Sequence, residues 1–389
     1  MTDILKRLMQ ESTRLTQAGH LAQATQTLQR SLGAGLGDKL SSKLAETLRS
    51  ALGGLAGASR RAAADDMVID GCVTALKSAT GSAANDRRDT TQPGEFSSAS
   101  HSHGGLNRSY KLYTPPGADR DSVRRPLLVM LHGCTQNPDD FAAGTGMNAL
   151  AQQHGVWVLY PAQSADANPQ RCWNWFKHNH QQRGRGEAGW IAHLTQTLLA
   201  QHQIDPARVW IAGLSAGGAM AASVASAYPE LYAALGVHSG LAAGAATDLP
   251  QALQAMRSGA SATPAAAAVA VPTIVFHGAQ DSTVHPRNGE QVIDGVLQAG
   301  RSAKHSAAQA AGLPAASTEQ GQAAGGRRYT RRSQTGLDGR PLTEHWLVHG
   351  AGHAWSGGQA AGSYTDAGGP DASAEMLRFF MAQHGSRSG

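Results

Sequence analysis

The sequence predicts an α/β fold, with a mostly parallel central sheet, helices on both faces and an N-terminal helical extension. Two observations lead to this prediction. Short apolar runs alternate with helical segments over residues 106–384, as in chains that wind a parallel sheet. Residues 127–131 (LLVML) are apolar without interruption, which is typical of a strand buried on both faces.

The expected elements follow in chain order from these patterns. The strands are expected at 110–114, 127–131, 156–160, 209–212, 233–237, 273–276 and 345–348. The helices are expected at 147–154, 188–203, 216–227 and 373–383. Two Ala-rich segments, 242–270 and 299–335, are expected to form surface loops or short helices.

The chain before residue 106 divides into two parts. Residues 1–56 carry leucines at roughly helical spacing and predict a helical extension. It either packs on its own domain or docks a partner or an apolar surface. Residues 57–105 show no regular period and end in SSASHSHGG, so we expect a partly disordered linker. The α/β domain is then expected to span 106–384.

Composition excludes several function classes. The formal charge is +5, but the excess is spread in pairs such as Arg327-Arg328 without a long basic run, which argues against nucleic-acid binding. Three cysteines do not make a disulfide scaffold, and no metal-ligand spacing is present. The first residues lack the apolar stretch of a secretory signal, and nothing approaches a membrane span. We therefore expect a cytoplasmic protein.

Residues 213–217 form a G-x-S-x-G pentapeptide centred on Ser215. By itself this pattern arises often by chance. Here it lies between an expected strand and an expected helix, which is the context that the motif requires. A sharp turn between the two exposes the serine hydroxyl, and the helix N-terminus favours negative charge. Ser215 is therefore the predicted nucleophile.

A serine hydroxyl needs a base, and in this arrangement an Asp or Glu and then a His follow the serine along the chain. The predicted acid is Asp281, in the loop after the strand at 273–276. Asp248 and Asp294 compete in poorer contexts, an Ala-rich stretch and an apparent helix. The predicted histidine is His353, in the Gly-rich loop after the last strand, with His349 as the alternative.

A tetrahedral intermediate needs hydrogen-bond donors for its oxyanion. One predicted donor is the backbone N–H of Ala216, the residue after the nucleophile. The second is expected from the loop after the strand at 127–131, and we assign it to the N–H of Cys134. The Cys134 side chain is not expected to act as a nucleophile.

Seven motifs carry a resemblance to a known family. They are LHGCTQ (131–136), CWNWF (172–176), GLSAGGAMA (213–221), VHSG (237–240), FHGAQDSTVHP (276–286), GAGHAWSGG (350–358) and SYTDAGGPDASAEMLRFF (363–380). Together they resemble the esterase/polyhydroxybutyrate depolymerase family of the α/β-hydrolase superfamily. More narrowly, they resemble the type 1 catalytic domain of short-chain-length polyhydroxyalkanoate depolymerases. The resemblance covers about 106–384.

The resemblance implies a serine esterase with the triad Ser215, Asp281 and His353, which needs no metal or cofactor. It also implies a substrate, a polymer or oligomer of 3-hydroxyalkanoate esters such as 3-hydroxybutyrate. Because no signal was found, we expect an intracellular enzyme that acts on stored polymer, with residues 1–56 as a contact to the granule surface. No nucleic acid or membrane span is expected.

Further residues enter with the resemblance. Cys134 and Cys172 lie in two matched motifs, so a disulfide between them is conceivable, whereas a cytosolic location argues against its persistence. This question stays open. Trp173, Trp175 and Trp355 are expected either to form an apolar wall for the acyl chain or to pack in the core.

Two other functions compete with this one. A feruloyl or acetyl-xylan esterase would share the scaffold and the motifs. A non-catalytic protein that coats polymer granules would keep the fold without the reaction, although the intact triad pattern argues against it.

Overall fold

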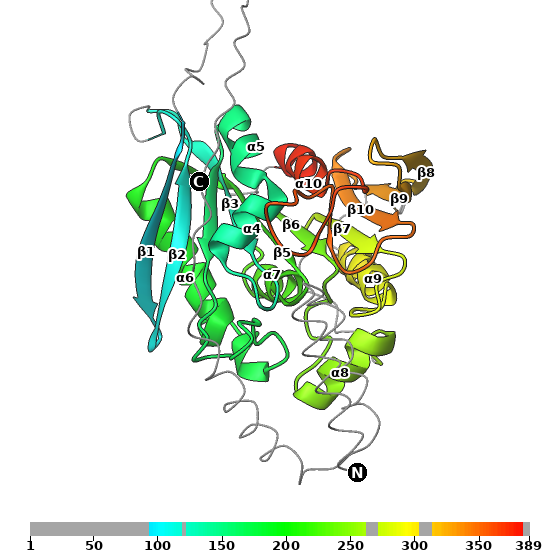
Figure 1. Cartoon of the computed structure of the whole chain (residues 1–389), viewed down its shortest axis with the longest axis horizontal. Coiled ribbons are helices and arrows are strands. Elements are labelled where there is room, and N and C mark those ends of the chain that lie inside the picture. Colours follow the sequence, from blue (N-terminus) through cyan, green and yellow to red (C-terminus); the bar gives the residue numbers. More distant parts are fainter. Residues whose placement is uncertain (1–92, 119–121, 262–270, 303–312, 384–389) are drawn as a thin grey trace, which may run out of the picture. The chain divides into compact units, whose positions relative to one another are not determined.

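A mixed sheet of ten strands, in the order β1-β2-β4-β3-β5-β6-β7-β10-β9-β8, organises the described part of the computed structural model (Figure 1). The structure describes residues 93–118, 122–261, 271–302 and 313–383. The strands are β1 Glu95–His103, β2 Leu106–Thr114, β3 Arg125–Leu131, β4 Trp157–Pro161, β5 Ile204–Leu214, β6 Ala234–His238, β7 Thr273–Gly278, β8 Ser317–Gln322, β9 Arg328–Thr335 and β10 Pro341–Val348.

Helices of the described residues accompany this sheet, and some of them cover its two faces. They are α4 Pro138–Thr145, α5 Met147–His154, the short 3₁₀ helix η1 His178–His180, α6 Gly186–Gln201, α7 Ala216–Ala227, α8 Leu249–Ser258, α9 Arg287–Ser302 and α10 Ala372–Met381. A small second sheet pairs β11 Trp355–Ser356 with β12 Thr365–Asp366.

The central strands β4, β3, β5, β6, β7 and β10 run parallel, and antiparallel strands flank them on both sides. Side chains alternate between the faces along each strand. Leu127, Val129 and Leu131 pack with α6 and α7, whereas Leu128 and Met130 pack with α5 and α10. Because both faces are buried, the strand is apolar throughout, and the predicted α/β-hydrolase architecture is confirmed.

The prediction of a linker up to residue 105 is wrong at its C-terminal end. Residues 95–103 form β1, which pairs with β2 in an antiparallel hairpin at the edge of the sheet. Gly104 (φ 58°) and Gly105 (φ 77°) form the two-residue turn. Two successive glycines between strands indicate such a hairpin turn, but the Ser-rich composition of β1 concealed it. The domain therefore begins before Leu106.

The expectation of loops or short helices over 299–335 is also wrong. Helix α9 extends to Ser302, and β8 and β9 form a second hairpin on the opposite edge.

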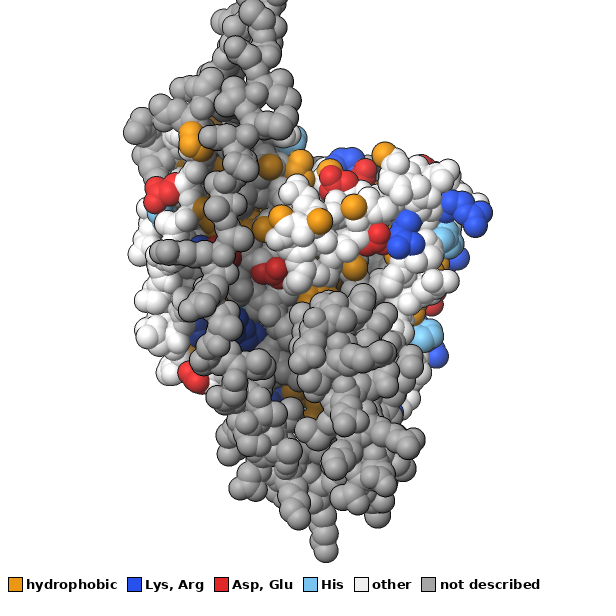
Figure 2. All heavy atoms as spheres, viewed as in Figure 1, with side chains coloured by type: hydrophobic (Ala, Val, Ile, Leu, Met, Phe, Trp, Pro, Cys, Tyr) orange, Lys and Arg blue, Asp and Glu red, His pale blue; other side chains and the backbone are white. Residues whose placement is uncertain are grey.

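Strand β9 carries Arg328, Arg331 and Arg332. Figure 2 shows basic side chains gathered over this edge, so part of the positive charge is clustered rather than evenly spread. The edge strand of the β8–β9 hairpin is β8, and its polar residues oppose pairing with another sheet.

The N-terminal predictions lie outside the described residues. These are the helical extension at 1–56 and the linker up to residue 92, and both stay predictions. The described residues belong to one compact unit. Among the helices of the described ranges, none combines the length and the apolar character needed to cross a bilayer.

The β1–β2 turn can be tested by protein stability, with a control substitution that is expected to change the free energy of unfolding in the opposite direction. A Cβ at Gly105 meets open space, so Gly105→Ala costs only the left-handed backbone, about 1–2 kcal/mol. A Cβ at Gly295 also meets open space, but Gly295 lies inside α9, so Gly295→Ala is expected to stabilise by about 1 kcal/mol. Chemical denaturation measures both. Equal effects of the two substitutions would contradict the hairpin.

Candidate active site

Ser215 occupies the sharp turn between β5 and α7. Its φ of 57° and ψ of −120° are rare for a residue other than glycine. Gly213 and Gly217 allow the turn to close. A Cβ at Gly213 would overlap the backbone of Gly217, and one at Gly217 would overlap the carbonyl oxygens of Leu131 and His132. The strand, turn and helix that the pentapeptide requires are therefore present.

Asp281 and His353 come from different loops and meet in space. Asp281 follows β7 and His353 follows β10, and His353 Nδ1 lies 2.7 Å from Asp281 Oδ2. The other carboxylate oxygen accepts the N–H groups of Thr283 and Val284, both at 2.9 Å. Because β5, β7 and β10 are parallel, their C-terminal ends lie at one edge of the sheet, which also carries Ser215.

A second histidine, His277, lies next to Asp281. Its Nε2 donates to Val284 O (2.8 Å) and is 3.5 Å from Asp281 Oδ2. Burial alone would raise the pKa of Asp281, but the contacts with His277 and His353 outweigh it and hold this pKa well below its usual range. The carboxylate is therefore ionised and can orient the His353 ring. Sequence reasoning assigned His277 no role.

The competing residues have other contacts. Asp248 caps α8, where its Oδ1 accepts the N–H of Gln251 (2.8 Å). Asp294 lies within α9. His349 Nε2 is 2.9 Å from the Thr330 hydroxyl on β9. The geometry therefore favours Asp281 and His353 over all three.

The loop after β3 presents one unoccupied amide. The Gly133 N–H donates to Gln136 Oε1 (2.9 Å), and the Thr135 N–H donates to Gln170 O (2.6 Å). The Gln136 N–H donates to Gly133 O (3.4 Å). Within the described residues no acceptor remains for the Cys134 N–H, so this amide is free to bind an oxyanion. Ala216 begins α7, where the first N–H groups have no partner inside the helix.

Cys134 and Cys172 form a disulfide, which answers the question that the sequence left open. Cys134 lies in the loop after β3, and Cys172 lies in the segment that leads to η1. The bond therefore ties the loop after β3 to a second loop 38 residues later in the chain.

Two of the three tryptophans that were expected either to form an apolar wall for the acyl chain or to pack in the core do not line such a wall. Trp173 and Trp355 are fully buried. The Trp173 indole N–H donates to His132 O (3.1 Å), and that of Trp355 donates to Ser373 Oγ (3.0 Å). The two rings also belong to cores on opposite faces of the sheet, so both pack in the interior. Trp175 is 5% exposed, and its substrate role stays a prediction.

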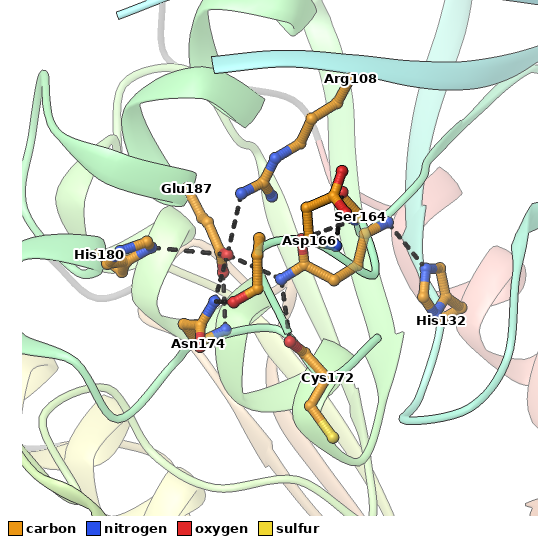
Figure 3. A network of polar contacts seen from close by, with 10 residues as sticks. Arg108, His132, Ser164, Asp166, Cys172, Asn174, His180 and Glu187 are labelled. Carbon is orange, nitrogen blue, oxygen red and sulfur yellow. Dashed lines mark hydrogen bonds and ion pairs between the residues drawn. The ribbon is translucent and has the colours of Figure 1, made fainter. Parts of the chain in front are cut away.

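Sequence reasoning missed a network of polar contacts around Glu187, which is drawn in Figure 3. Glu187 lies in the first turn of α6 and is completely buried. An acidic residue at a helix N-terminus is ordinary in sequence, because it complements the helix dipole. Only the fold shows that its partners come from distant segments, among them Arg108 on β2.

Three further histidines, His132, His238 and His345, are buried. Burial lowers the pKa of His132 to about 4 and that of His238 well below its usual range. Burial, with His277 and Arg332 nearby, lowers the pKa of His345 to about 4. A buried imidazole avoids its charged form because the interior solvates a charge poorly. The folded protein therefore binds these protons less readily than the unfolded chain does.

The low pKa values predict how stability depends on pH. Between about pH 6.5 and 4 these histidines bind protons in the unfolded chain but stay neutral in the folded protein. The free energy of unfolding therefore falls as the pH falls. His345→Leu is expected to reduce this fall by on the order of 3 kcal/mol. Urea denaturation at several pH values measures it, with exposed His178→Gln as the control. A fall as steep in His345→Leu as in the wild type would contradict the assignment.

Comparison with known proteins places the chain in a family. The model of the family described as esterase PHB depolymerase matches residues 108–318, more than half of the 389 residues. Poly(3-hydroxyalkanoate) depolymerase C of Paucimonas lemoignei is 36% identical over 181 residues, 43% of this chain and 44% of that protein. Poly(3-hydroxybutyrate) depolymerase of Ralstonia pickettii is 30% identical over 171 residues, 41% of this chain and 35% of that protein. The match thus spans less than half of either depolymerase.

Other relatives have different names. A probable acetylxylan esterase A of Neosartorya fischeri is 27% identical over 199 residues, 46% of this chain and 51% of that protein. Among solved structures, an acetyl xylan esterase from Aspergillus awamori superposes with a TM-score of 0.54 at 17% identity and covers 74% of this chain and 99% of that chain. That likeness supports the fold. With the family model matched over more than half of its length, the chain belongs to the esterase PHB depolymerase family.

Proposed function

We propose that the chain is a serine carboxylic ester hydrolase that cleaves polyesters or oligoesters of 3-hydroxy acids, 3-hydroxybutyrate among them. The observation that carries the proposal is the Asp281–His353 contact of 2.7 Å at the sheet edge that bears Ser215. The names of the two depolymerases among the relatives support the choice of substrate.

The proposed reaction is a two-step acyl transfer. His353 takes the proton of the Ser215 hydroxyl as that oxygen attacks the ester carbonyl, and Asp281 orients His353 and stabilises its charged form. The N–H groups of Cys134 and Ala216 hold the oxyanion. The alcohol leaves with the proton from His353. Water then attacks the acyl-enzyme as His353 takes its proton, and this proton returns to Ser215 as a hydroxy acid is released. No step needs a metal or a cofactor.

The nucleophile can be tested directly. Ser215→Ala is expected to lower kcat for p-nitrophenyl butyrate by about 10⁵-fold or more, because the attacking oxygen is removed. Ser223→Ala is the matched control, since Ser223 lies on the same helix and its hydroxyl donates to Ala219 O inside α7. It should keep wild-type turnover. Wild-type turnover by Ser215→Ala would reject the proposed nucleophile.

The substrate class needs a separate measurement. We expect a higher kcat/KM for oligomers of 3-hydroxybutyrate than for methyl ferulate or acetylated xylan, with 3-hydroxybutyrate or its dimer as the product. The second candidate, a feruloyl or acetyl-xylan esterase, is favoured by the acetylxylan esterases among the relatives. The reverse order of kcat/KM would establish it. Failure of a fluorophosphonate probe to label Ser215 would favour a non-catalytic granule protein instead.

The compartment also stays a proposal. The sequence predicts a cytoplasmic enzyme that contacts polymer granules through residues 1–56, which lie outside the described residues. The Cys134–Cys172 disulfide bears on this prediction, because structural disulfides persist mainly in oxidising compartments. Titration of the Cys134 and Cys172 thiols in protein isolated from cells distinguishes the two compartments. Free thiols are expected of a cytoplasmic enzyme, and a bonded pair is expected of an exported one.

A further inference from the structure

The buried carboxylate of Glu187 has no part in the proposed reaction, yet its contacts lead to the oxyanion loop. We propose that Glu187 is a positioning residue that holds residues 132–134, and with them the Cys134 N–H, in the geometry that receives the oxyanion. The inference rests on the proposed function, since it assigns a task to a residue outside the triad.

Glu187 gathers donors from several segments (Figure 3). Its Oε1 accepts from Arg108 Nη2 (3.2 Å), Gln163 Nε2 (2.7 Å) and Asn174 Nδ2 (2.7 Å). Its Oε2 accepts the backbone N–H of Asn174 (2.7 Å). His180 Nδ1 lies 3.5 Å from Oε1. One carboxylate thus joins β2, the segment after β4, the segment after Cys172 and η1 to the start of α6.

These donors keep Glu187 charged in spite of its burial. Burial alone would raise its pKa, but the His180 imidazole, the Arg108 guanidinium and the amides of Gln163 and Asn174 outweigh it and lower the pKa to about 2. At neutral pH the group is therefore a carboxylate, which accepts hydrogen bonds and donates none.

The first connection to the oxyanion loop passes through Gln163 and His132. The Gln163 side chain is held by Glu187, and its backbone N–H donates to His132 Nε2 (3.1 Å). His132 Nδ1 in turn donates to Gly133 O (2.7 Å), the carbonyl next to the Cys134 N–H. This chain requires a neutral imidazole with the proton on Nδ1, in accord with the pKa of about 4.

The second connection passes through Cys172. Gln163 Nε2 donates to Cys172 O as well (2.9 Å), and Glu187 fixes the backbone of the next-but-one residue, Asn174. The Cys172 side chain is bonded to Cys134 itself. Both connections therefore end on residues 132–134, one by hydrogen bonds and one by a covalent bond.

A purely structural role explains this arrangement poorly. A buried ion pair such as Glu187–Arg108 contributes little net stability, because desolvation offsets the attraction, and apolar residues of similar volume often replace such pairs without loss. What the charge does supply is a fixed direction for each donor that it binds. Such preorganisation is what an oxyanion donor needs, since catalysis depends on donors already in place.

The test is Glu187→Gln, which keeps the shape of the side chain. The new NH₂ group cannot accept, so at least one of the donors from Gln163 or Asn174 loses its partner. We expect kcat for p-nitrophenyl butyrate to fall about 10- to 100-fold, less than for a deleted oxyanion donor, while KM changes by less than about threefold. Affinity for a boronic acid that forms a tetrahedral adduct with Ser215 should fall by a factor similar to that of kcat.

The controls separate this inference from a loss of folding and from the proposed function. Glu230→Gln removes an exposed carboxylate that pairs with Arg183 (2.7 Å), and it should leave kcat unchanged. Rates are expressed per folded molecule, measured by near-ultraviolet circular dichroism. An unchanged kcat in folded Glu187→Gln, with Ser215→Ala inactive, would overturn the role of Glu187 alone. Full turnover by Ser215→Ala would overturn both proposals.

If Glu187→Gln does not fold, the variant Gln163→Leu tests the same inference. It leaves Glu187 with Arg108 and Asn174 and retains the Gln163 backbone N–H, but it removes the side-chain links to Glu187 and Cys172 O. The expected result is again a lower kcat with little change in KM and a weaker boronic acid complex. Wild-type values for all three would overturn the inference.

Discussion

The candidate site depends on one close approach, that of the turn after β5 to the end of β3. Gly217 lies so near the carbonyl oxygens of Leu131 and His132 that a Cβ there would overlap both. Strands β3 and β5 are neighbours in register, with Leu131 opposite Gly213. The turn that holds Ala216 and the loop that holds Cys134 therefore lie side by side. The proposed sharing of one oxyanion by these two N–H groups requires this approach, which a side chain at residue 217 would prevent.

The acid side of the site shows how a buried charge is supported. Asp281 receives two backbone N–H groups on one oxygen and lies close to two imidazoles on the other. His277 Nε2 is committed to Val284 O, so it shapes the loop that holds Asp281. His353 has no such backbone tie at Nδ1 and bonds the carboxylate directly. The two histidines therefore have different contacts, and only His353 has the contact that the proposed proton transfer requires.

Much of the fold could be predicted because local patterns encode it, and the same patterns led to the proposed triad. The bounds of α5 and α7 agree with the prediction, since each has a clear start and end in the sequence. Strand β1 could not be recognised, because its Ser and His side chains lie at an edge where little apolar surface is buried. Trp173 and Trp355 lie near site motifs in sequence, but burial is a property of the whole fold.

Glu187 was out of reach of sequence reasoning for a related reason. A single carboxylate gives no local signal of the donors that surround it, and its partners at Arg108, Gln163 and Asn174 are spread along the chain. Neither their identity nor their spacing forms a motif. Such a network becomes visible only when the fold brings its members together.

Residues 132–134 are held by the Cys134–Cys172 disulfide and by the hydrogen bonds of the Glu187 network, and only the disulfide depends on the redox state of the compartment. In an oxidising compartment the Cys134–Cys172 bond limits the movement of the oxyanion loop by itself, and the Glu187 network adds to a constraint already present. In a reducing compartment the thiols separate, but Cys172 O can still accept from Gln163, and Gln163 can still hold His132. The loop then depends more on the Glu187 network, beside its own hydrogen bonds such as that from the Thr135 N–H to Gln170 O. The contribution of this buried carboxylate to turnover should therefore be larger in the reduced protein than in the oxidised one, so its size depends on where the enzyme works.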